Sequence, residues 1–116
     1  MSLLALALLA AQAMAPGDQV TFDIHCMIAA QAAHEQADGA MKAATLLSTM
    51  FYFGRVDSAL PEAEMEQRLA TESARIEGQP LGPLLEKCGA FMQQRGQQLE
   101  AIGARLTSPP RRAEIH

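Results

Sequence analysis

The sequence contains little of what β-sheets are built from. It has no tryptophan, one tyrosine, four phenylalanines and two valines among 116 residues. Because β-branched and aromatic side chains favour strands, their scarcity argues against any substantial sheet. Alanine, leucine and methionine dominate the apolar residues instead, and all three favour helices. The composition therefore predicts an all-α protein.

Basic residues are also scarce and scattered. Nine lysines and arginines stand against thirteen aspartates and glutamates, which gives a net charge of −4. The one clear basic pair, Arg111-Arg112, lies near the C-terminal end. Since proteins that bind phosphate backbones carry clustered positive charge, we expect no nucleic-acid partner.

Sequence motifs that carry chemistry are missing. There is no Cys-x-x-Cys-His, no His-Glu-x-x-His and no glycine-rich phosphate loop. His25, Cys26 and Met27 are soft ligand types, with His34 on the same predicted helix, but neighbouring residues of a helix point apart. We therefore expect no cofactor, no metal site and no enzymatic activity. Metal binding by these residues and a nucleophilic Cys26–His pair are the alternatives.

The N-terminal end resembles a secretory leader. A short apolar run, residues 3–10, is followed by small residues that suit a signal peptidase. We expect residues 1–13 to be a signal peptide, because cleavage after Ala15 would leave Pro16 as the first residue. A retained N-terminal helix is the alternative. The mature protein is then periplasmic or secreted, with no stable membrane insertion after the leader is removed.

The chain has two cysteines, Cys26 and Cys88. In an oxidising compartment two thiols usually form one disulfide. Closing a loop of about sixty residues stabilises a fold by roughly 4 kcal/mol in the chain-entropy model. We expect a structural Cys26–Cys88 bridge. Free or metal-bound thiols and pairing between chains are the alternatives.

The mature part is predicted to be one helical domain, residues 18–106, followed by a disordered tail, residues 107–116. Proline and glycine separate its helices, and Asp23 is a suitable N-cap for the first. We expect a compact, bundle-like domain of four helices, over residues 23–36, 40–56, 61–76 and 85–106.

The apolar pattern predicts which parts of these helices are buried. Residues 40–56 are apolar nearly all round, so this helix is expected to be the most buried. In the third helix Glu72 is expected to face outward. The fourth helix carries a stripe with alternating three- and four-residue steps, which predicts an inward seam of Leu85, Cys88, Met92, Arg95, Leu99, Ile102 and Leu106.

Three adjacent aromatic residues stand at the end of the second helix. The segment Phe51 to Asp57 reads Phe-Tyr-Phe-Gly-Arg-Val-Asp, and Arg55 and Asp57 are placed to form an ion pair. Such a cluster is typical of a packing centre at the end of a helix. The alternative is a binding groove formed by Phe51, Tyr52, Arg55 and Asp57.

A leader, Cys26 in the first helix, the Phe51–Asp57 segment and Cys88 in the last helix together resemble small exported proteins of Gram-negative bacteria. More distantly, this layout is similar to the HdeA/HdeB acid-stress chaperones. The resemblance implies a small helical periplasmic protein with one disulfide. It also implies an unfolded client or another protein as the partner.

The sequence therefore predicts a non-catalytic exported protein that acts by protein contact, with envelope stress or acid-chaperone activity as the leading hypothesis. A periplasmic protein that binds a small ligand or a metal ion is the alternative.

Overall fold

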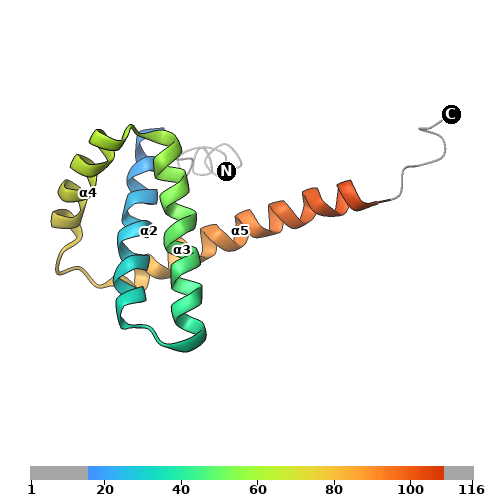
Figure 1. Ribbon diagram of the computed structural model, residues 1–116, viewed down its shortest axis with the longest axis horizontal. Coiled ribbons are helices and arrows are strands. Elements are labelled where there is room, and N and C mark those ends of the chain that lie inside the picture. The colour runs from blue at the N-terminus through green and yellow to red at the C-terminus, as the bar shows by residue number, and fades with distance from the viewer. Residues whose placement is uncertain (1–15, 109–116) are drawn as a thin grey trace, which may run out of the picture. The chain divides into compact units, whose positions relative to one another are not determined.

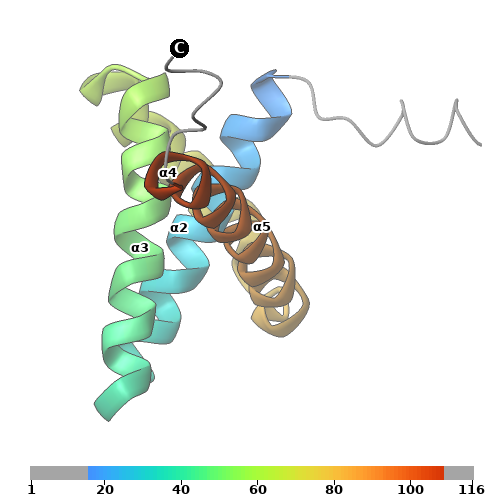
Figure 2. The same cartoon turned by 90° about the vertical axis from the view of Figure 1, so that its right-hand side faces the viewer.

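Four α-helices account for most of residues 16–108, the part of the chain that the computed structural model describes, and this part contains no strand (Figures 1 and 2). Together with the disulfide between Cys26 and Cys88, they confirm the predicted all-α class. The predicted signal peptide and residues 109–116 of the predicted tail lie outside the described residues. The helices are α2 (Pro16–Gln36), α3 (Gly39–Ala59), α4 (Glu62–Ile76) and α5 (Leu81–Thr107).

The chain divides into two units after Leu85. The first unit holds α2, α3, α4 and the start of α5, and the second holds the remainder of α5. In the first unit α2 runs between α3 and α4 (Figure 1). It packs extensively along α3 and less along α4, whereas α3 and α4 barely contact each other. The helix α2 is therefore the centre of this unit.

The helix α2 begins at Pro16 and not at the predicted N-cap, Asp23. Proline fits the first turn of a helix, where its missing N–H has no partner to lose, and Asp18 adds negative charge at this end. Asp23 instead lies buried within the helix. The prediction of a cap failed because a short carboxylate serves equally well in a buried ion pair.

Burial is concentrated on α2, which corrects the prediction that residues 40–56 form the most buried helix. The helix α2 contributes small buried residues such as Ala29 and Ala30, and residues of this size let a neighbouring helix approach closely. In α3 only Tyr52 and Val56 are buried. A helix that is apolar on all sides does not indicate which side contacts a neighbouring helix. The apolar residues of α3 that lie exposed are Met41, Leu46, Leu47, Met50 and Phe53.

The helix α4 follows Pro61 and carries Glu62 and Glu64 in its first turn. Met65 and Ile76 are buried. Glu72, expected to face outward, is only 3% exposed. Glu72 is buried because it lies next to α2, and the charge pattern of α4 did not indicate this contact.

In the second unit, the remainder of α5 is a single helix ending at Thr107. Cys88 is buried, as the predicted seam requires. Farther along the same stripe, Leu99, Ile102 and Leu106 are exposed, Leu99 by 68%. The prediction of an inward seam is therefore wrong for these three residues and for Arg95, which is also exposed. A three-and-four pattern shows that a helix has an apolar side, but not that this side is covered.

None of the helices over residues 16–108 combines the length and apolar character needed to cross a membrane.

Candidate functional groove

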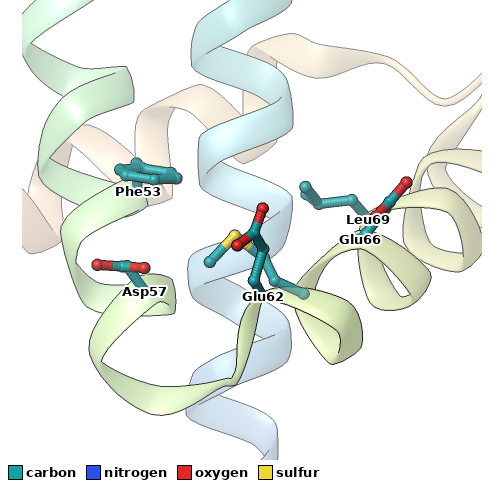
Figure 3. A pocket seen from close by; sticks show the side chains of 6 residues that line it. Phe53, Asp57, Glu62, Glu66 and Leu69 are labelled. Atoms are coloured by element: carbon teal, nitrogen blue, oxygen red, sulfur yellow. The ribbon is translucent and has the colours of Figure 1, made fainter.

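An open hollow of about 490 Å³ lies between α3 and α4 (Figure 3). It exists because both helices pack against α2 and hardly touch each other. Phe53 and Asp57 extend from α3 on one side, and the other lining residues belong to α4. These α4 residues are Glu62, Met65, Glu66 and Leu69.

Two further hollows continue from the first. The second, of about 360 Å³, shares Leu69 with the first hollow and adds Met27 and Ile28 of α2 as apolar lining. The third, of about 220 Å³, shares Ile28 and Ser73 with the second. We call the three together the α3–α4 groove, although only the first two have α3 residues in their lining; the third lies between α2, α4 and the loop that follows α4. It follows α4 from Glu62 to Ile76, which is about 20 Å at the rise of an α-helix.

Of the four residues predicted as a binding groove, Asp57 lines the α3–α4 groove. The aromatic residue beside it is Phe53. Tyr52 is fully buried, and its ring meets the rings of Phe22 and Phe51 edge to face at centroid distances of 6.3 and 4.9 Å. Phe51 and Tyr52 therefore help to pack α3 against α2.

Arg55 adds an ion pair to the packing of α3 against α2. Its Nε donates a hydrogen bond of 3.0 Å to Oδ1 of Asp23, and its guanidinium carbon lies 5.9 Å from the Phe51 ring centroid. Gln19 donates a second hydrogen bond to the same carboxylate oxygen. The predicted partner of Arg55, Asp57, lies at the groove instead. Sequence reasoning missed Asp23 because it is far from Arg55 along the chain.

The environment of Tyr52 shifts its ionisation. Burial raises the pKa of the Tyr52 phenol to about 12, since a phenolate would be poorly solvated there. The negative charge of Asp23 raises this pKa further, while the positive charge of Arg55 lowers it.

A second polar connection joins α2 to α4. Nε2 of His25 lies 2.7 Å from Oε1 of Glu72, and Arg75 lies 3.3 Å from Oε2 of the same carboxylate. Close by, Arg68 donates a hydrogen bond of 2.9 Å to Thr21. The buried carboxylate of Glu72 is thus satisfied on both oxygens. No local sequence pattern indicates this contact, because its two helices are far apart in the chain.

The residues considered for metal binding have other partners. His25 pairs with Glu72, and Nδ1 of His34 lies 3.0 Å from the Lys42 carbonyl oxygen. Cys26 is oxidised in the disulfide with Cys88. Over residues 16–108, no group of three or more histidine, cysteine, aspartate or glutamate side chains is placed to hold a metal ion.

Comparison with known proteins finds no matching family, no matching curated protein and no matching solved structure. The fold and the groove therefore define the class of this protein by structure alone. It is an all-α protein with one disulfide and an open apolar groove between two helices.

Proposed function

We propose that this chain is a non-catalytic exported protein that acts by binding other proteins, with protection against envelope or acid stress as its role. The α3–α4 groove is the observation that carries the proposal. It is lined by α3 and α4 at one end and by α2 and α4 at the other, its lining is mainly apolar in the middle, and it is open along its length. Such a groove suits the apolar face of another protein segment.

Exposed apolar residues beside the groove support the same function. Leu46, Leu47 and Met50 lie next to one another on α3, and Phe53 continues this row to the groove itself. Contiguous exposed apolar residues often mark contact surfaces. Methionine suits a surface that accepts varied partners, because its side chain is flexible and polarisable.

The disulfide supports export. Disulfides form and persist mainly in extracellular and periplasmic compartments. The predicted signal peptide, residues 1–13, points to the same destination. Together the two support the proposed periplasmic or secreted location.

Two buried carboxylates give the acid-stress role a physical basis. Asp23 holds Arg55 of α3, and Glu72 of α4 holds His25 of α2. Strong acid neutralises carboxylates in general and leaves the chain with its positive charges alone, which repel one another. Acid is therefore expected to loosen α3 and α4 from α2 and to expose the groove more widely.

The experiment is suppression of client aggregation, measured by light scattering at pH 2–3 and at pH 7. The wild-type protein is expected to suppress aggregation in acid and much less at neutral pH. Leu69→Asp places a charge where two hollows meet and is expected to weaken the effect. Thr71→Asp is the matched control, because Thr71 is exposed on the opposite side of α4. Equal activity of both variants would contradict the groove's role.

A small-ligand protein is the second candidate. The middle hollow, of about 360 Å³, falls within the size range of small-molecule sites and has Met27, Ile28 and Leu69 in its lining. Calorimetric titration with small apolar ligands, and with copper and zinc ions, tests this alternative. Absence of both heat and any change in melting temperature would rule it out.

A further inference from the structure

Three carboxylates surround one end of the groove. Asp57 extends from α3, and Glu62 and Glu66 extend from neighbouring turns of α4. Figure 3 shows Asp57 and Glu62 on either side of the space between the two helices. All three residues are exposed, and the apolar side chains of Phe53, Met65 and Leu69 lie among them.

Over residues 16–108, the ion pairs have Glu72 and Asp23 as their acidic partners, and none involves these three carboxylates. Arg68 of α4 is bonded to Thr21 of α2. Three like charges thus line one hollow, on a chain whose net charge is already −4. A bound cation would relieve their mutual repulsion, so this end favours a positively charged ligand.

The remainder of the groove changes in character away from this end. The middle hollow has no charged residue in its lining, and the far hollow has only Glu77. A ligand that fills the groove therefore needs an apolar side about 20 Å long, which is about four turns of an α-helix. An extended peptide is less suited, because residues 16–108 offer no strand edge with which its backbone could pair.

We propose that the α3–α4 groove binds an amphipathic helix of a partner protein that carries lysine or arginine beside one end of its apolar face. This inference rests on the proposed binding of other proteins by the groove, not on the acid-stress role, and names the partner's chemistry at neutral pH. The apolar side chains of the partner helix lie along Phe53, Leu69 and Ile28, and its cationic residues meet Asp57, Glu62 and Glu66.

The test uses three synthetic amphipathic peptides of about 18 residues with one shared leucine face. Their polar faces carry lysine, glutamine or glutamate. Binding to the full oxidised chain is measured by fluorescence anisotropy at low and high salt. Three surface ion pairs together correspond to about tenfold in affinity. The lysine peptide is therefore expected to bind about tenfold more tightly than the glutamine peptide at low salt, and the glutamate peptide more weakly than both.

Two triple variants separate the local from the general effect of charge. The groove variant combines Asp57→Asn, Glu62→Gln and Glu66→Gln, and is expected to lose the preference for lysine while still binding the glutamine peptide. The control variant makes the same change in charge at exposed residues outside the groove lining and keeps the preference. Its substitutions are Asp18→Asn, Glu64→Gln and Glu100→Gln.

The outcomes distinguish the two proposals. If the lysine and glutamine peptides bind equally, or if both triple variants behave alike, the cationic partner is refuted while groove binding stands. If no peptide binds at pH 7 or at pH 3, or if Leu69→Asp leaves the binding of every peptide unchanged with the fold intact by circular dichroism, both proposals fail.

Discussion

Ionisation of Tyr52 offers a direct test of the packing between α2 and α3. Tyr52 is the only tyrosine of a chain without tryptophan, so ultraviolet absorbance reports the ionisation of this one phenol. Burial and the charge of Asp23 raise its pKa from 10.0 to about 12. We expect an absorbance midpoint near 12 in the native protein and near 10 in concentrated guanidinium chloride.

The same shift predicts how stability depends on pH. The folded state keeps the phenol protonated up to a pKa of about 12, whereas the unfolded chain releases the proton near 10.0. The unfolded state therefore gains stability relative to the folded state as the pH rises from 10 toward 12. At 1.36 kcal/mol per pKa unit, the free energy of unfolding falls by on the order of 2 kcal/mol over this range. Tyr52→Phe should remove this part of the alkaline loss, which denaturant titrations at several pH values can measure.

Two substitutions test the causes of the shift. Asp23→Asn removes a negative charge that raises the Tyr52 pKa, so the midpoint should move down. Arg55→Met removes a positive charge that lowers it, so the midpoint should move up. A native midpoint near 10, with the circular dichroism of the folded protein intact, would refute the burial of Tyr52 and the reasoning built on it.

Three further predictions concern the stability of the fold. Glu72→Ala should cost about 2 kcal/mol, because it removes the buried partner of His25, whereas Glu66→Ala should change the free energy of unfolding by no more than about 0.5 kcal/mol. Equal effects in denaturant titrations would contradict the burial of Glu72. Leu99→Asp should cost less than about 1 kcal/mol, since this side chain is 68% exposed; unfolding of the variant would show that the stripe is covered. Reduction of the disulfide at Cys88 should cost roughly 4 kcal/mol, and an unchanged melting temperature under reductant would count against its structural role.

Much of the secondary structure could be predicted from sequence because its causes are local. Helix-forming composition and the turn residues around Gly39, Pro61 and Gly78 were enough to separate four helices. The predicted start of the first helix, at Asp23, was wrong because aspartate suits both a helix cap and a buried ion pair. The pairing of the two cysteines could be predicted because the chain holds no third cysteine.

The candidate site was only partly predictable. The aromatic segment correctly indicated the end of α3 as part of the site. However, Phe53 and Asp57 line the groove, whereas Tyr52 is buried in the packing with α2. Adjacent residues of a helix point in different directions, so one segment supplies both a core and a groove wall. Which of these residues packs in the core and which lines the groove depends on the position of α2.

The sequence by itself determined the helices, their order and the cysteine pairing. Helix propensity and turn residues act over short stretches of the chain, and the pairing follows because the chain has only two cysteines. Only the tertiary structure decided that α2 and not α3 is the central helix, that Glu72 is buried against His25, and that the space between α3 and α4 is open. These outcomes depend on contacts between residues far apart in the chain, and a helical pattern specifies an apolar side without specifying what covers it.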